Sequence, residues 1–222
     1  SLTTFNGNSL PSEPFSVSLY LVDQDKIITL DFEDYILGLV SNEISPDYCI
    51  ETIKAQTVAI RSFVLNKLCF QDKEDIIIKH KGANLCDGSH CIKWFPFDKS
   101  ILQYDSNSLF ENKTKYQTAL SETQGEYIEY NNTPATTFWH KISHGRTENS
   151  LDILEIDYPY HKSVLSESDK FAPGYISRVI YPTDAFNTIM KGLNKDAVNI
   201  FSANNIIGDV SSTPGGSVLT VQ

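Results

Sequence analysis

The chain has 222 residues, 18 basic against 28 acidic, for a formal net charge of −10, and 41% of its residues are hydrophobic. This composition provides a core for one domain or two tightly joined subdomains and excludes a mainly disordered chain. The acidic excess, with only three arginines, argues against a nucleic-acid partner, because phosphate contacts need a clustered cationic surface. An anionic ligand would have to meet positive charge locally, inside a site.

No run of residues is long and apolar enough for a membrane span, and no basic and then apolar leader opens the chain. The chain starts at Ser1 without a methionine. We therefore expect that a leader or membrane anchor belongs to the full-length protein and is absent from this chain.

The first expected elements are two short β-rich runs, at 16–22 and 26–32, which Asp23-Gln24-Asp25 separates. This arrangement predicts a β-hairpin. An acidic residue at 31, 33 or 34 can cap the helix that follows. That helix should end near Ile44, because Pro46 disfavours helical geometry at Ser45.

The segment 47–70 predicts the longest helix of the chain. Its apolar positions recur at spacings of four, three, four and four, at Ile53, Thr57, Ile60, Val64 and Leu68. Such a pattern indicates one buried stripe. Lys54 and Arg61 share a different face, with Gln56 offset between them, and a basic pair of this kind is by itself most often a solvated face.

The rest of the chain predicts shorter elements. In order, we expect a long loop at 71–100, strands at 101–104, 126–130 and 136–142, helices at 116–122 and 183–193, and a strand from 218 onward. Together the elements predict an α+β fold with a mixed or antiparallel sheet, one long buried helix and an open substrate groove. We expect one catalytic unit over 1–222, or two packed subdomains at about 1–100 and 101–222.

Four side chains with metal-binding chemistry fall within twelve residues: His80, Cys86, His90 and Cys91. They match a closed tetrahedral zinc site in type and number, although His90 and Cys91 are adjacent and would both have to turn inward. Two alternatives stay open, a Cys86–Cys91 disulfide in an oxidising compartment or four ordinary loop residues. Zinc here would staple a loop that has no core of its own, and a saturated site would not be catalytic.

Two stretches, DYILGLVSNEI at 34–44 and ETIKAQTVAIRSF at 51–63, resemble the stage II sporulation protein D family. The matching positions are Tyr35, Gly38, Glu43, Lys54, Gln56 and Arg61. The resemblance continues with Ala119-x3-Thr123-x-Gly125 and with the segment from His140 through Ser143, Gly145 and Thr147. His144 and Arg146 flank Gly145 where the family commonly has a second small residue, which predicts a different loop geometry there.

The resemblance implies a lytic transglycosylase that cuts peptidoglycan glycan strands outside the cytoplasm, usually tethered to a membrane. In sporulating bacteria such enzymes act during engulfment, beside an amidase that first strips the stem peptides. The family's catalytic acid aligns with Glu43. The resemblance also implies that other motif residues line or support the substrate groove: Lys54, Gln56, Arg61, His140, Ser143, Gly145, Arg146 and Thr147.

This chemistry needs one carboxyl group and no catalytic cofactor. Hydrolytic glycosidases usually use two carboxylates. In a lytic transglycosylase the C6 hydroxyl of the N-acetylmuramic acid ring is the nucleophile, so Glu43 would first donate and then accept a proton. We expect Lys54 and Arg61 to reach the lactyl carboxylate or acetamide oxygens of the substrate.

Two alternatives come from other classes. His140 and His144 share the i, i+4 spacing of some zinc hydrolases, which would make the chain a zinc-dependent cell-wall amidase or peptidase. Lys141 stands where such motifs carry a glutamate, which argues against it. A non-catalytic glycan-binding module is the second alternative, and the retained Glu43 argues against it.

Overall fold

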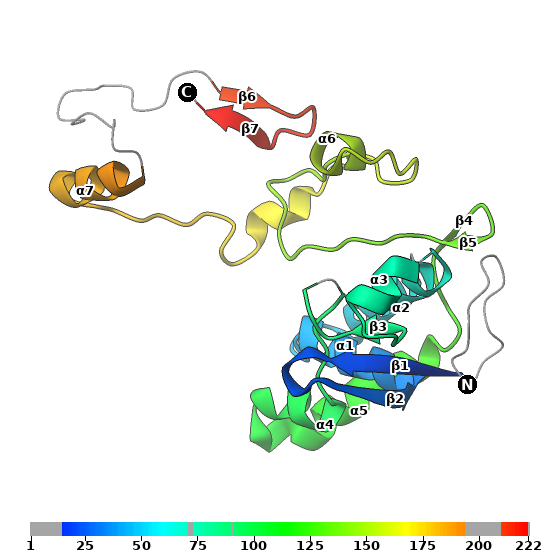
Figure 1. Cartoon of the computed structure of the whole chain (residues 1–222). Coiled ribbons are helices and arrows are strands. Elements are labelled where there is room, and N and C mark those ends of the chain that lie inside the picture. Colours follow the sequence, from blue (N-terminus) through cyan, green and yellow to red (C-terminus); the bar gives the residue numbers. More distant parts are fainter. Residues whose placement is uncertain (1–14, 71–72, 90, 194–209, 222) are drawn as a thin grey trace. The chain divides into compact units, whose positions relative to one another are not determined.

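The computed structural model describes residues 15–70, 73–89, 91–193 and 210–221 (Figure 1). Helices and small sheets alternate irregularly along the chain, which confirms the predicted α+β class. The chain divides into two compact units, Ser1–Phe138 (the N-terminal unit) and Trp139–Gln222 (the C-terminal unit). We describe each unit by itself.

A β-hairpin opens the N-terminal unit, as predicted. β1 (Ser16–Leu21) and β2 (Lys26–Asp31) pair antiparallel, from Ser16 opposite Asp31 to Leu21 opposite Lys26. The short 3-10 helix η1 (Val22–Gln24) makes the turn. β3 (Leu85–Cys86) pairs with β1 in parallel, so the sheet order is β2-β1-β3 (Figure 1).

The next helix, α1 (Phe32–Glu43), begins and ends where its sequence predicts. The side chain of Asp31 accepts hydrogen bonds from the N–H groups of Glu33 and Asp34, which satisfies two otherwise unpaired donors. Ile44 is already extended, with φ −131° and ψ 137°. Glu43 is therefore the last helical residue.

The longest helix is α2 (Ile50–Phe70), with 21 residues. All five residues of the predicted stripe are buried. α2 packs against α1 and against α5 (Leu109–Glu122), and these contacts form the centre of the unit. Because α5 packs on α2, the division between the units falls after Phe138 and not near residue 100.

The connection from α2 to α5 is more structured than the predicted loop. It contains α3 (Lys73–Ile78), β3 and α4 (Phe97–Ser100), followed by the 3-10 helices η2 (Ile101–Gln103) and η3 (Ser106–Ser108). The strand predicted at 101–104 is wrong. Ile101 is buried and Leu102 is exposed, but the backbone continues the helical turn of α4. A short apolar run did not distinguish the two conformations.

After α5 the chain forms a tight hairpin of β4 (Glu129–Tyr130) and β5 (Thr133–Pro134). Asn131 and Asn132 both have positive φ, as in type I′ turns. The strand predicted at 136–142 is wrong. A side-chain hydrogen bond, and not backbone pairing with a neighbouring strand, holds this segment. Thr137 donates its hydroxyl proton to Ala59 O at 2.7 Å and so holds this segment along α2.

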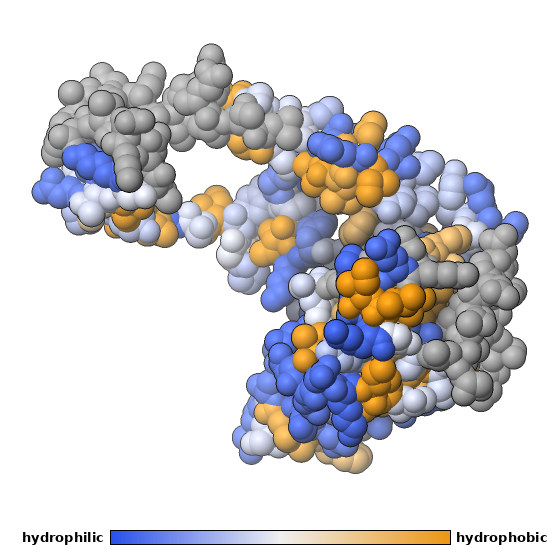
Figure 2. All heavy atoms as spheres, viewed as in Figure 1, coloured by the Kyte–Doolittle hydropathy of each residue, from blue (hydrophilic) through white to orange (hydrophobic). Residues whose placement is uncertain are grey.

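The C-terminal unit contains α6 (Ser150–Leu154), the 3-10 helix η4 (Glu167–Phe171), α7 (Thr183–Leu193) and the antiparallel pair β6 (Val210–Ser212) and β7 (Val218–Val221). α7 and β7 confirm the predicted helix at 183–193 and the predicted strand from residue 218 onward. Hydrophobic residues gather over α6 in Figure 2, where Leu151 and Ile153 are about half exposed. Within the described part of the chain, none of the helices combines the length and the apolar character that a membrane crossing requires.

Candidate functional site

Glu43 lies half-buried at the C-terminal end of α1, where helix carbonyls lack partners within the helix. Two tyrosines supply partners. Tyr104 donates its hydroxyl proton to Ser41 O at 3.0 Å and approaches Ile44 O at 3.3 Å, and Tyr116 donates to Ile44 O at 2.5 Å. Burial raises the pKa of both tyrosines, so each hydroxyl keeps its proton. The backbone on both sides of Glu43 is thereby fixed.

Further contacts hold the same backbone from the segment 93–115. Ser41 and Ser100 share a buried hydrogen bond of 2.5 Å between their hydroxyls. Asn42 donates to Lys93 O at 3.3 Å, and Lys115 donates to Pro46 O at 2.6 Å. Residues 41–46 are therefore anchored at several points.

The motif glycine at 38 allows a close approach. A Cβ atom there would lie 2.6 Å from Phe95 O and nearer still to Trp94 Nε1. The indole of Trp94 also stacks on Tyr35, with ring centroids 6.5 Å apart. Gly38 thus lets the 94–95 segment rest on α1, one turn and a half before Glu43.

Arg61 is fully buried and holds α2 to two other segments. Its Nε and Nη2 donate to the two carboxylate oxygens of Glu33 at 2.9 and 2.8 Å, and Nη1 donates to Glu126 O at 2.9 Å. This fork-like pairing, with the bond to Glu126 O, engages all three nitrogens of the guanidinium. The geometry differs from the expectation that Arg61 reaches the substrate and gives this residue a supporting place.

Lys54 is also engaged by carboxylates, those of Glu122 at 2.5 Å and Glu51 at 2.9 Å. The hydrogen bond with Glu122, followed by that with Glu51, raises the pKa of Lys54. Gln56 differs from both cations. Its side-chain nitrogen is buried and has no hydrogen-bond partner among the described residues. An unpaired buried donor is costly, which sets Gln56 apart from the two paired cations.

Three of the four predicted metal ligands come together. One ligand atom from each of His80, Cys86 and Cys91 lies within 4.8 Å of the others, and Cys91 Sγ is 3.4 Å from His80 Nε2. His90 lies outside the described residues. Neither cysteine forms a disulfide with a described residue, and burial raises the pKa of Cys91 to about 12. A buried sulfur from Cys86 and a partly buried sulfur from Cys91, beside an imidazole, are a donor set that zinc prefers.

In the C-terminal unit Ser143 is fixed by a residue that the sequence did not suggest. Asp169 Oδ2 accepts the Ser143 N–H at 2.7 Å and the Ser143 hydroxyl at 2.6 Å. These two hydrogen bonds hold the pKa of Asp169 below its ordinary value. Gly145 has φ +107° and donates its N–H to Ser143 Oγ at 3.1 Å.

The loop geometry does not require positive φ from the residues that flank Gly145. Neither His144 nor Arg146 is among the described residues with positive φ. The departure from the family pattern is therefore tolerated, because glycine takes the one strained position. Tyr175 donates its hydroxyl proton to His144 O at 3.0 Å and supports the loop from outside.

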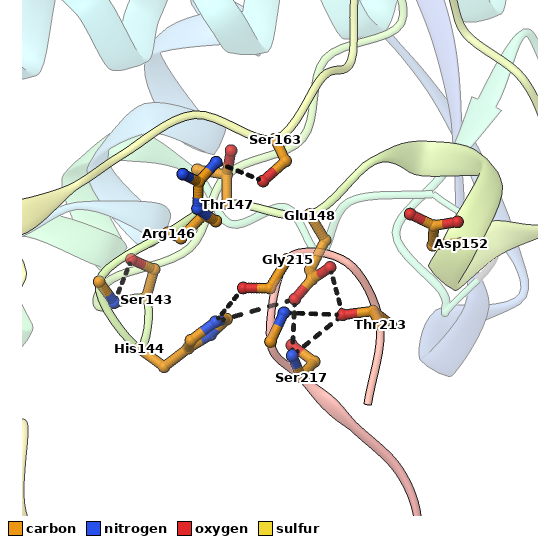
Figure 3. A network of polar contacts seen from close by, with 12 residues as sticks. Ser143, His144, Arg146, Thr147, Glu148, Asp152, Ser163, Thr213, Gly215 and Ser217 are labelled. Carbon is orange, nitrogen blue, oxygen red and sulfur yellow. Dashed lines mark hydrogen bonds and ion pairs between the residues drawn. The ribbon is translucent and has the colours of Figure 1, made fainter. Parts of the chain in front are cut away.

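Three motif residues, Gly145, Arg146 and Thr147, form hydrogen bonds with the segment 163–166. Ser166 N donates to Gly145 O at 2.9 Å, and Thr147 N donates to Val164 O at 2.8 Å. Thr147 also accepts the Val164 N–H through its hydroxyl at 2.9 Å. Arg146 is half-buried and donates to Ser163 Oγ at 3.3 Å (Figure 3). Thr147 is thus structural, whereas Arg146 keeps further donors.

A carboxylate that the sequence analysis did not single out, Glu148, connects the 140–147 segment to the β6–β7 hairpin (Figure 3). Glu148 accepts the Thr213 hydroxyl at 2.8 Å and the Ser217 N–H at 3.0 Å. Burial raises the pKa of Glu148, but the hydrogen bonds from Ser217 and Thr213 outweigh it and hold the pKa below 4.5. His144 Nε2 lies 2.8 Å from Gly215 O and 3.9 Å from Glu148.

This network bears on the metal-hydrolase alternative. The one group of three metal-binding side chains found among the described residues is His80, Cys86 and Cys91. His140 is exposed, and His144 is engaged by the hairpin turn. Within the described part of the chain, His140 and His144 are therefore not part of a group of three metal-binding side chains.

Comparisons with known proteins agree with the sequence motifs. The sequence model of the SpoIID family, described as "Stage II sporulation protein", matches residues 22–130, which include Glu43, Lys54, Gln56 and Arg61. The chain is 27% identical to stage II sporulation protein D of Bacillus subtilis and 24% identical to that of Bacillus amyloliquefaciens, over 96% of this chain in both cases. An uncharacterized protein of Brachyspira hyodysenteriae is 25% identical over 71% of this chain and 38% of its own length. The chain spans 59% of the length of the two Bacillus proteins.

Proposed function

The chain belongs to the stage II sporulation protein D family, and from this premise we propose that it is a peptidoglycan lytic transglycosylase. It cleaves the bond between N-acetylmuramic acid and N-acetylglucosamine and leaves a 1,6-anhydro end. Its role is cell-wall remodelling during sporulation, at the engulfment stage.

In the proposed reaction Glu43 acts alone as acid and base. Its carboxyl proton goes to the glycosidic oxygen as the C1–O bond breaks. The C6 hydroxyl of the same muramic acid ring then attacks C1, and the Glu43 carboxylate takes the hydroxyl proton. Attack within one ring has a high effective concentration, so a second carboxylate is not needed.

The observation that carries this proposal is the fixed, half-buried position of Glu43. Proton transfer requires a carboxyl group held within hydrogen-bond reach of the scissile oxygen. The hydroxyls of Tyr104 and Tyr116 hold the carbonyls on either side of Glu43, and this anchoring supplies such positioning. Lys54 and Arg61 are bound by other carboxylates, those of Glu51, Glu122 and Glu33.

We assign the substrate contacts to motif side chains whose hydrogen-bond donors are not all used within the protein. Gln56 offers a buried amide donor, and Arg146 offers a cation for the lactyl carboxylate. Ser143 and His140 are further proposed contacts of the extended glycan strand.

We also propose a structural zinc ion bound by His80, Cys86 and Cys91, with His90 as the fourth ligand. Two thiolates and two imidazoles would saturate a tetrahedral site, so the ion would fold the 80–91 segment and take no part in catalysis. The fit rests on the convergence of three ligand atoms within 4.8 Å.

The setting of the reaction is likewise proposed. The enzyme acts outside the cytoplasm on strands from which an amidase has stripped the stem peptides, and membrane partners of the sporulation machinery recruit it. A membrane anchor is part of this proposed setting.

Digestion of peptide-free glycan strands tests the catalytic assignment. The wild-type chain should shorten the strands, and Glu43→Gln should abolish shortening while strand binding persists. Glu51→Gln is the matched control, since it removes an exposed carboxylate nearby, and it should leave turnover within about twofold. Release of stem peptides from intact peptidoglycan would favour the amidase alternative, and binding without cleavage by the wild type would favour a glycan-binding module.

A further inference from the structure

Asp169 has no place in the reaction described above, yet it makes the two shortest hydrogen bonds to the Ser143 loop. It lies on η4, 26 residues beyond Ser143, and one oxygen, Oδ2, accepts both the N–H and the hydroxyl of Ser143. Both bonds are charge-assisted, and such bonds are about twice as strong as neutral ones.

The donors and acceptors of the Ser143 hydroxyl can be assigned from these contacts. A serine hydroxyl has one proton and two lone pairs. The proton points to Asp169 at 2.6 Å, and one lone pair accepts the Gly145 N–H at 3.1 Å. One lone pair remains, so Ser143 can accept a hydrogen bond from a ligand but has no proton to donate.

We propose that Asp169 is a positioning residue that makes Ser143 a hydrogen-bond acceptor for an N–H or O–H group of the glycan. Because the inference rests on the proposed function, the ligand group is an acetamido N–H or a sugar hydroxyl. A carboxylate or carbonyl oxygen of the glycan is excluded at Ser143, since it would face a lone pair. Asp169 itself does not touch the substrate.

The charge of Asp169 suits this role. The Ser143 hydroxyl, then the Ser143 N–H, lower the pKa of Asp169, with a smaller contribution from the Ser166 side chain. The carboxylate is therefore ionised at neutral pH and accepts both protons of Ser143. Glu167, on the same turn, is exposed and provides a matched charge control.

Binding of peptide-free glycan strands to a Glu43→Gln parent tests the inference without cleavage. Asp169→Ala should raise Kd about tenfold, as expected for one charged hydrogen bond, and Ser143→Ala should do the same. The double variant should bind no more weakly than the weaker single variant, because both changes remove one interaction. Asp169→Asn, whose amide oxygen can still accept, should recover part of the affinity, and Glu167→Gln should bind like the parent.

Several outcomes would overturn the inference: an unchanged Kd for Asp169→Ala, fully additive effects of the two substitutions, or a parent that does not bind strands. If Asp169→Ala fails to fold, the Ser143 amide resonance of the parent decides instead. It should shift as Asp169 titrates and lose this titration in Asp169→Asn, and an amide that does not titrate contradicts the contact. A wild type that makes no anhydro ends, with a non-additive binding cycle, would refute the transglycosylase function and leave the role of Asp169 standing.

Discussion

At the scale of single residues, some side chains of the family motifs hold the fold together. Arg61 is one of these, because its three hydrogen bonds go to the Glu33 carboxylate and the Glu126 carbonyl. Removing one partner of a buried pair strands the other charge, which explains why a motif residue need not touch the substrate. Gln56 differs, since its buried amide nitrogen has no partner among the described residues.

Tyr116→Phe tests the anchoring of the Glu43 backbone. It deletes the hydroxyl that donates to Ile44 O, which leaves that buried carbonyl with the longer bond from Tyr104. The free energy of unfolding should fall by about 1–2 kcal/mol, and turnover per folded molecule should fall as well. Urea denaturation and strand digestion measure the two effects. Tyr48→Phe, at an exposed position, is the control and should change neither.

At the scale of elements, the sequence predicted those helices and strands that depend on interactions between neighbouring residues. The first hairpin, α1, α2 and α7 follow from alternation, capping and periodicity, all of which are contained in neighbouring residues. The strand predicted at 101–104 was wrong because the backbone continues the helical turn of α4, and the strand predicted at 136–142 was wrong because a contact with the distant helix α2 holds that segment. The partners of the motif residues were missed for the same reason. Asp169 lies 26 residues from Ser143, and Tyr116 lies 72 residues from Ile44.

Gly38→Ala tests the packing of the 94–95 segment on α1. The new methyl group would overlap Trp94 and the carbonyl oxygen of Phe95, a backbone atom that cannot move away cheaply. We expect a loss of about 1–3 kcal/mol in the free energy of unfolding, typical of overpacking, and a red shift of tryptophan fluorescence. Gly192→Ala, in α7 with open space around the Cβ position, should leave both unchanged.

The docking of the β6–β7 turn on the motif should depend on pH through Glu148. The folded pKa of this group lies below 4.5, so its contribution to stability is present above that value and is lost as pH falls through the folded pKa. Acidification below pH 4.5 should therefore detach the turn, and the amide protons of Ser217 and Gly216 should exchange faster. In Glu148→Gln this pH dependence should disappear, and a wild-type hairpin that is unaffected by acid would contradict the assignment.

At the scale of the whole molecule, the charge of −10 constrains how the chain can bind an anionic polymer. Two of the expected cations, Lys54 and Arg61, are neutralised by acidic neighbours. In the proposed function, Arg146 supplies positive charge for the lactyl carboxylates, since its one described hydrogen bond, to Ser163, leaves it further donors. Association with glycan strands should for this reason depend on one site and only weakly on the overall surface.

The proposed zinc ion is also a property of the whole fold, since the 80–91 segment joins the first sheet through β3. Elemental analysis of protein purified without chelator should find about one equivalent of zinc. Cys86→Ser should lose the metal and lower the melting temperature, while turnover per folded molecule stays near that of the wild type. Cys49→Ser, an exposed cysteine, should retain both zinc and stability. Protein that contains almost no zinc, or a Cys86→Ser variant as stable as the wild type, would refute the site.

The central claim is that Glu43 alone promotes a reaction in which the sugar's own hydroxyl is the nucleophile. Mass spectrometry of the new ends in digested peptide-free strands tests it most directly. We predict muramic acid ends lighter by one water molecule than the hydrolysis product, formed by the wild type and absent with Glu43→Gln. Reducing ends in their place would contradict the account, because water would then be the nucleophile and a second carboxylate would have to activate it.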